Sequence, residues 1–242
     1  MERGVARESA ASKCLEFVWK ETHRVNRTGF GCLIDIYTQV VMMGGMGAFN
    51  EKLYFITPIE NIPSIMEHGI LSYKKANKLP NSHGSVALQP VQEKRDKISV
   101  PNGRLLHEYA NVYFNPRNAM MYLRKDLVDT LCVVVVSAKI LRIPDVVISD
   151  MNAAALYARF KTPDELGTLD FGAIYAKNWN HQDPELKAAH KRLMCAEVLV
   201  PDRVPPEAIL SVYVGNDAAQ KALVVTGFPS EKIKMKPYFF FI

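Results

Sequence analysis

Cysteine is scarce in this sequence, and none of it is spaced to bind metal. The 242 residues include four cysteines, with no CxxC pair and no ligand spacing to the six histidines, although zinc and redox sites depend on such spacing. The HExxH motif of metalloproteases and the GxSxG motif of serine hydrolases are absent as well. We therefore expect no metal site, and thiols that stay reduced, as they do in a cytoplasm.

Glycine-rich phosphate loops are also missing. No GxGxxG follows a predicted strand and no GxxxxGK[ST] occurs, which excludes the Rossmann and P-loop classes. GGMGAF at 44–49 has the wrong spacing, so we interpret it as a turn.

Long hydrophobic runs are absent too. The most apolar stretch, residues 30–49, contains Asp35 and Gln39 and is interrupted by glycines, which argues against a membrane span. The first 13 residues carry charges of both signs and no apolar segment follows them, so we expect no signal peptide and a cytoplasmic protein. The net charge of +5 is compatible with a polyanionic partner without demonstrating one.

The hydrophobic pattern divides the chain in two. Residues 1–50 carry a helical stripe and predict a helical extension of unknown role, and residues 51–242 form the main domain. Strands are expected at 53–57, 111–114, 130–137, 146–149, 194–200, 209–214 and 233–241. Helices are expected after Pro58, after Arg117 and at 152–160, and residues 72–106 form a long polar loop. Without regular βα alternation, this order predicts an α+β fold with a mixed or antiparallel sheet, folded as a split barrel with short flanking helices.

One carboxylate stands in an apolar strand. In MCAEVLV (194–200), alternation places Cys195, Glu197 and Leu199 on one face, and neither face of the strand is polar. An ionised carboxylate in such a setting is costly unless it is paired. Glu197 is therefore either structural or a charge held at a site.

Further polar residues lie near strand ends: Thr57, Asn61, Arg95 in QEKRDK, and several side chains of HEYANVYFNPRNAMMY (107–122). Each alone is compatible with a structural role. In order, LYFIT-P-IENIPSIMEHGIL, a basic loop, HEYANVYFNPRNAMMY, SDMNAA and MCAEVLVPDRVPP resemble the DarT family over residues 51–242. These are toxin ADP-ribosyltransferases that attach ADP-ribose from NAD to a base of single-stranded DNA.

The resemblance implies roles for individual residues. Glu197 falls on the family's catalytic glutamate, where a carboxylate stabilises the positive charge of the ribose as nicotinamide leaves. Arg95 best matches an arginine that contacts the NAD phosphates and helps to deprotonate the base, although Lys94 or Arg104 would fit after a short shift of the alignment. The implied NAD-binding residues are Phe55, Thr57, Asn61, Arg95, Tyr113 and Met120, with Arg117 in the same pocket-lining stretch.

Two departures from the family concern polar positions of the pocket. Phe55 stands where the family has the histidine of a His-Ile-Thr motif, and Asn152 stands where a histidine is usual. They leave the target base open between guanine and thymine, with a slight preference for guanine.

The implied DNA contacts come from the loop and the segment after it: Lys94, Arg104, His107, Tyr109 and Asn152, with Lys74, Lys75, Lys78 and Lys97 as further phosphate contacts. The family also implies an antitoxin that hydrolyses ADP-ribosyl-DNA. Two alternatives remain open: an NAD-dependent transferase acting on RNA or protein, and a non-catalytic module that binds single-stranded nucleic acid.

Overall fold

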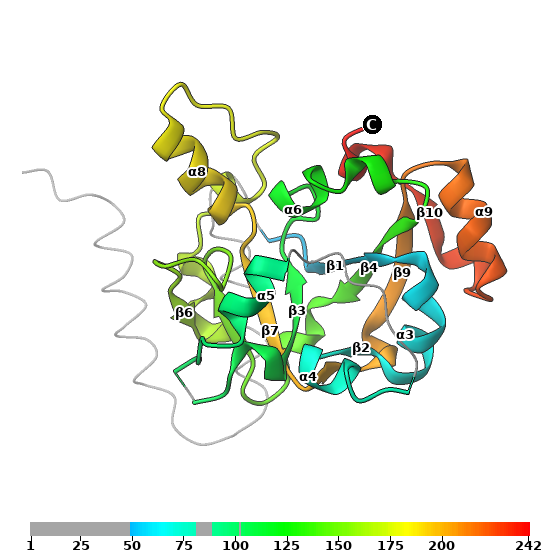
Figure 1. Ribbon diagram of the computed structural model, residues 1–242, viewed down its shortest axis with the longest axis horizontal. Coiled ribbons are helices and arrows are strands. Elements are labelled where there is room, and N and C mark those ends of the chain that lie inside the picture. Colours follow the sequence, from blue (N-terminus) through cyan, green and yellow to red (C-terminus); the bar gives the residue numbers. More distant parts are fainter. Residues whose placement is uncertain (1–48, 81–88, 102) are drawn as a thin grey trace, which may run out of the picture. The chain divides into compact units, whose positions relative to one another are not determined.

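The computed structural model describes residues 49–80, 89–101 and 103–242 (Figure 1). The helical extension expected at 1–50 lies outside these residues, apart from positions 49 and 50. Phe49 is buried and packs edge-on against Phe114 in the main core. No helix of the described chain is long and apolar enough to cross a bilayer.

An open sheet of eight strands is the centre of the described fold. Its order is β10-β9-β4-β1-β3-β7-β5-β6, and every neighbouring pair is antiparallel except the parallel pair β10 and β9. The strands are β1 (Lys52–Pro58), β3 (Tyr109–Tyr113), β4 (Leu131–Ser137), β5 (Val147–Ser149), β6 (Phe160–Lys161), β7 (Glu197–Pro201), β9 (Ile209–Val214) and β10 (Ile233–Met235). A second sheet pairs β2 (Ile70–Leu71) with β8 (Arg203–Val204). The α+β class and the mixed sheet are confirmed, and the sheet is not a closed barrel.

The sheet splits between β1 and β3. These two strands share a single register pair, Tyr54 opposite Tyr113, whereas β1 and β4 are paired over the full length of β1. Beyond Tyr54, β1 has no partner strand on the β3 side among the described residues. Side chains of β1 and β3 line the space between the diverging strands, where the pocket described below opens.

Short helices flank the sheet: α3 (Ile62–His68), α4 (Tyr73–Ala76), α5 (Gln89–Arg95), α6 (Ala119–Tyr122), α7 (Phe171–Ile174), α8 (Pro184–Leu193) and α9 (Asp217–Val225). Helix α3 ends at Gly69, whose φ of 80° is a backbone conformation that residues with a side chain rarely adopt. A side chain there is excluded, since a Cβ would lie 2.0 Å from the carbonyl oxygen of Val204.

Three predictions of secondary structure were wrong. Residues 152–160 form turns that lead into β6 instead of a helix. The strand expected at 233–241 stops at Met235, and a 3-10 helix (Pro237–Phe240) follows, because proline cannot donate to a sheet. The polar segment 72–106 is not a continuous loop, since it contains α4 and α5.

Candidate active site

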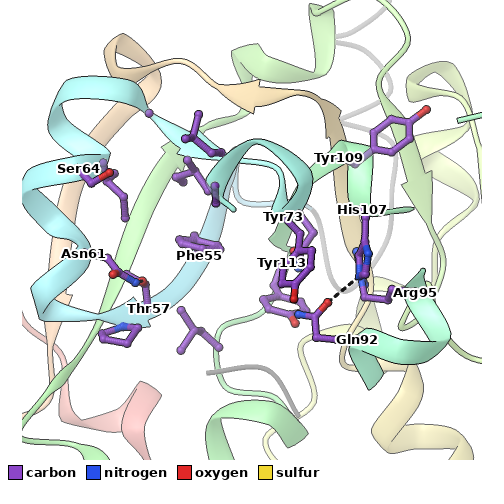
Figure 2. A pocket seen from close by; sticks show the side chains of 18 of the residues that line it. Phe55, Thr57, Asn61, Ser64, Tyr73, Gln92, Arg95, His107, Tyr109 and Tyr113 are labelled. Carbon is purple, nitrogen blue, oxygen red and sulfur yellow. Dashed lines mark hydrogen bonds between the residues drawn. The ribbon is translucent and has the colours of Figure 1, made fainter. Parts of the chain in front are cut away.

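A pocket opens where β1 and β3 diverge. Its walls come from β1, α3, α4, α5, β3 and α6. Six of the residues implied to bind NAD line it: Phe55, Thr57, Asn61, Arg95, Tyr113 and Met120. Figure 2 shows Thr57, Asn61 and Ser64 on one side of the pocket and Gln92, His107 and Arg95 on the other.

The β1 wall is held by a short polar contact. Asn61 donates from Nδ2 to Oγ1 of Thr57 at 3.0 Å, and Thr57 is buried. Thr57 lies at the end of β1 and Asn61 is the N-cap of α3, so this contact fixes the start of the helix against the strand. The side chain of Phe55 is half-buried between these residues and Tyr113 (Figure 2).

Glu197 is fully buried at the start of β7, with 0% of its surface exposed. Its carboxylate accepts two hydrogen bonds from Nη1 of Arg95, at 3.0 Å to Oε1 and 3.3 Å to Oε2. The backbone N–H of Ala153 donates to Oε1 at 2.8 Å. A cation and an amide thus offset the burial cost that the apolar strand sequence predicted.

Arg95 forms the boundary between the pocket and Glu197. Its side chain is 9% exposed and lines the pocket, whereas Glu197 lies behind it and does not. Of the three cations considered from the sequence, Arg95 is the one that reaches the glutamate. Lys94 is exposed outside the pocket wall, and Arg104 pairs with Asp202 at 3.6 Å.

Asn152 shapes the turn that holds Glu197. Its Oδ1 accepts from the N–H of Ala154 at 2.9 Å, and this turn presents the Ala153 N–H to the carboxylate. Asn152 does not line the pocket. The turn geometry thus explains its position, and its expected contact with DNA stays a prediction.

Neighbouring strands place two more side chains beside Glu197. Tyr113 on β3 and Ser149 on β5 are both its register partners, so the three side chains form a row on one face of the sheet. Burial raises the pKa of the Tyr113 phenol above its ordinary range, and the nearby Glu197 charge raises it further. Ser149 is fully buried, and its Oγ has no hydrogen-bond partner in the described chain. Ser149 is the first residue of SDMNAA but was not among the predicted site residues, because only the pairing of β5 with β7 brings it beside Glu197.

The far wall carries a polar and aromatic group. The rings of Tyr73 and His107 lie 4.4 Å apart, and His107 Nε2 lies 3.0 Å from Oε1 of Gln92 (Figure 2). Burial lowers the pKa of His107, and Asp96 at 3.3 Å opposes that change. His107 and Tyr109, expected as DNA contacts, lie in the same pocket as the NAD candidates. Tyr73 and Gln92 were not among the predicted site residues, since no motif distinguishes them in a polar segment.

A buried glutamate at the start of a central strand, beside an arginine-walled pocket in a split sheet, is the arrangement that the resemblance in the sequence predicts. The comparisons with known proteins agree. A family model described as "ssDNA thymidine ADP-ribosyltransferase, DarT" matches residues 54–241. The chain therefore belongs to the DarT family.

Relatives from two genera support this membership. A DNA ADP-ribosyl transferase–DNA ADP-ribosyl glycohydrolase fusion protein of Thermosipho africanus is 33% identical over 174 residues, which are 69% of this chain and 43% of that protein. A DNA ADP-ribosyl transferase of Thermus sp. is 29% identical over 194 residues, 74% of this chain and 90% of that protein. The structure of Thermosipho africanus DarTG in complex with ADP-ribose superposes with a TM-score of 0.69 at 29% identity, over 79% of this chain and 51% of that chain. The chain thus spans about half the length of the fusion relative.

Within the described residues, no group of three or more His, Cys, Asp or Glu side chains is placed to hold a metal ion.

Proposed function

We propose that this protein transfers ADP-ribose from NAD to a base of single-stranded DNA and releases nicotinamide. The observation that carries the proposal is the buried Glu197 paired with Arg95 at the wall of a pocket that the six implied NAD-binding residues line. Family membership supports it, as do the names of the relatives, which are DNA ADP-ribosyl transferases. The Thermosipho relative was solved with ADP-ribose bound.

Glu197 serves the step in which the glycosidic bond breaks. As nicotinamide leaves with the bonding electrons, positive charge spreads over the ribose ring, and a fixed carboxylate stabilises that charge and orients the sugar hydroxyls. The carboxylate is held by Ala153 N–H, so its position does not depend on Arg95 alone.

Arg95 lies between the pocket and Glu197 in this structure. We expect its guanidinium to turn toward the NAD diphosphate when NAD binds, because phosphate oxygens offer it the same bidentate partner as a carboxylate. Glu197 then gains access to the ribose. One side chain can thereby both contact the phosphates and gate the catalytic carboxylate.

The acceptor is a nitrogen of the base. It forms a bond to C1′ of the ribose as the bond from C1′ to nicotinamide breaks, and the base gives up one proton. His107, which lines the pocket, can accept this proton, and the Arg95 guanidinium can stabilise the negative charge left on the base. No further co-reactant is required.

The description of the family model favours thymine as the target, whereas the departures at Phe55 and Asn152 keep guanine open. Mass spectrometry of oligonucleotides that differ in one base, after incubation with NAD, distinguishes the two. Addition of one ADP-ribose to the thymine- or guanine-containing strand alone is the expected result.

Labelled NAD offered with separate pools of single-stranded DNA, RNA and protein tests the alternatives. Label that enters only RNA or only protein would overturn the DNA assignment. Binding of DNA without release of nicotinamide would instead indicate a non-catalytic module. A partner that removes ADP-ribose from DNA is part of the proposal, because the Thermosipho relative is named as a fusion with a DNA ADP-ribosyl glycohydrolase. A cytoplasmic location stays a prediction.

A further inference from the structure

A cationic and aromatic surface lies beside the pocket and has no part in the site described above. It is defined by Arg117, Tyr122, Lys125, Trp179, Lys191 and Phe241. Three segments that are distant in the sequence contribute to it. They are residues 117–125, which contain α6, residues 179–193, which contain α8, and residues 236–242, which follow β10. Figure 1 shows α6 between α8 and that last segment, which is coloured red.

The aromatic rings form one connected group. The ring of Tyr122 lies 5.5 Å from that of Trp179 and 5.2 Å from that of Phe241, in both cases edge to face. The ring of Tyr122 is only partly covered by this packing, since the residue is 44% exposed, and Tyr238 next to the group is 50% exposed. Exposed tyrosines on a rigid base are surfaces on which nucleobases stack.

Cations stand over these rings. Lys125 Nζ lies 5.3 Å from the Tyr122 ring centre, Lys191 Nζ lies 5.9 Å from that of Trp179, and the guanidinium of Arg117 lies 3.9 Å from that of Phe241. Within the described chain, no carboxylate lies within 4.0 Å of the ammonium groups of Lys125 and Lys191. Residues 117–125, 186–192 and 232–242 each contain three lysine or arginine residues and no aspartate or glutamate.

Several cations of the polar segment 72–106, in contrast, lie close to carboxylates. Lys74 pairs with Glu108 at 2.8 Å, and Lys75 and Arg104 both lie near Asp202, at 3.5 and 3.6 Å. Carboxylates thus partly neutralise the loop cations that the sequence suggested for DNA. Charge complementarity to a polyanion is greater on the aromatic and cationic surface.

This surface connects directly to the pocket. Met120 lines the pocket and packs against the same core cluster as Phe241 and Phe239, and Tyr122 follows it by two residues in α6. A strand whose target base enters the pocket past Met120 would continue over α6 toward Tyr122.

We propose that this surface binds the nucleotides that flank the target base in single-stranded DNA, with bases stacked on Tyr122 and Tyr238 and phosphates on Lys125 and Lys191. The proposal rests on the proposed function. It assigns to this surface the sequence-independent, salt-dependent part of DNA binding.

Transfer to oligonucleotides of about 4 and about 20 nucleotides, with the target base in the same position, tests this assignment. The variant Tyr122→Ala/Lys125→Glu should raise the KM for the long strand about tenfold or more, as loss of one stacked base and one phosphate contact predicts. It should leave transfer to the short strand and the KM for NAD unchanged. The matched control is Lys221→Glu, which makes the same charge reversal on exposed α9.

The outcomes separate the two proposals. If wild-type protein modifies neither strand, the proposed function fails. If it modifies both strands and the surface variant has wild-type KM and salt dependence for the long one, the surface binds something other than DNA and this inference is overturned. Equal losses for both strands would also overturn it, because they would indicate a damaged pocket.

A separate observation concerns Ser149. Its buried hydroxyl has no partner, and it lies opposite Glu197 across β5 and β7, where a native structure seldom leaves such a group unused. We infer that Ser149 is a positioning residue, whose Oγ–H donates to the Glu197 carboxylate once Arg95 turns to the NAD phosphates. This inference also rests on the proposed function, because it requires the transferase reaction.

Ser149→Ala distinguishes a positioning role from a structural role, because a positioning role predicts a lower kcat without a loss of thermal stability. It removes no hydrogen bond from the free protein, so its thermal stability should stay equal or rise, while kcat for transfer falls about tenfold, as loss of a hydrogen bond to a charged group predicts. The KM for NAD should not change, and Ser149→Thr, which keeps the hydroxyl, should recover most of kcat. Wild-type kcat in Ser149→Ala, or a fall in stability that accounts for the lost activity, would refute the role.

Discussion

Arg95 and Glu197 are 102 residues apart in the sequence and form a buried ion pair, with 3.0 Å between Nη1 and Oε1. The pair joins α5, in the polar segment, to the central strand β7. Its two members have different surroundings, since the arginine faces the pocket and the glutamate does not. Substitution of Glu197 should therefore affect mainly the transfer step, and substitution of Arg95 should affect stability and the binding of NAD.

Glu197→Gln keeps the size of the side chain and removes its charge. We expect transfer to fall by about 10³-fold, or about 4 kcal/mol in activation free energy, because the carboxylate acts on charge that develops only in the transition state. The Kd for NAD should stay within about tenfold, or roughly 1.4 kcal/mol. Calorimetry with NAD and single-turnover transfer measure the two effects, and a parallel loss of both would make Glu197 a structural residue.

Arg95→Leu leaves a buried carboxylate with Ala153 N–H as its remaining recorded donor. The free energy of unfolding should fall by about 3 kcal/mol or more, as for other broken buried pairs. The double variant Arg95→Leu/Glu197→Leu should recover much of this loss, because no unpaired charge is left. Urea unfolding of the single and double variants gives the coupling energy, and additive losses would mean that the pair contributes little. The single variant should also need more NAD.

His107 should make stability depend on pH. Burial lowers its pKa below the ordinary value of 6.5, so the folded protein binds a proton less readily than the unfolded chain. Its contribution is present above pH 6.5 and is lost as the pH falls through the lowered pKa. Comparison of wild type with His107→Asn in urea unfolding between pH 7.5 and pH 5 should show a weaker pH dependence in the variant. Identical curves would exclude His107 as the source.

Cys195 should be inert in the folded protein. Burial is the largest cause that raises the pKa of its thiol to about 12, so almost no thiolate exists near neutral pH. Iodoacetamide should leave this position unmodified in native protein and modify it in urea, as measured by peptide mass spectrometry. Rapid labelling of the native state would show that the turn before β7 opens locally.

Strands could be predicted where β-branched residues follow one another, as in β4, because a buried strand is the element that such residues favour. The helix expected at 152–160 failed for a tertiary reason. Phe160 pairs with Ser149 in β6, and the Ala153 N–H is used by Glu197, so the local helical preference of an alanine-rich segment is overridden. Helix α8 was not predicted, although its sequence has the signals of a helix start, with Asp183 as N-cap and Pro184 in the first turn.

In the site, Glu197 is conspicuous in the sequence as a charge in an apolar strand, and the family resemblance selects Arg95 from several cations. Gln92 and Tyr73 have no comparable sequence signal, and Ser149 is only the first residue of SDMNAA. Their places depend on how α4, α5 and β5 pack, which is decided by long-range contacts.

The single register pair between Tyr54 and Tyr113 has a consequence for NAD itself. A dinucleotide in the gap would bridge the half of the sheet built on β1, β4 and β9 and the half that contains Glu197. The substrate would then fasten the two halves together for as long as it is intact. Loss of nicotinamide would remove one of its points of attachment, so the chemical step would also loosen the enzyme's hold on its product.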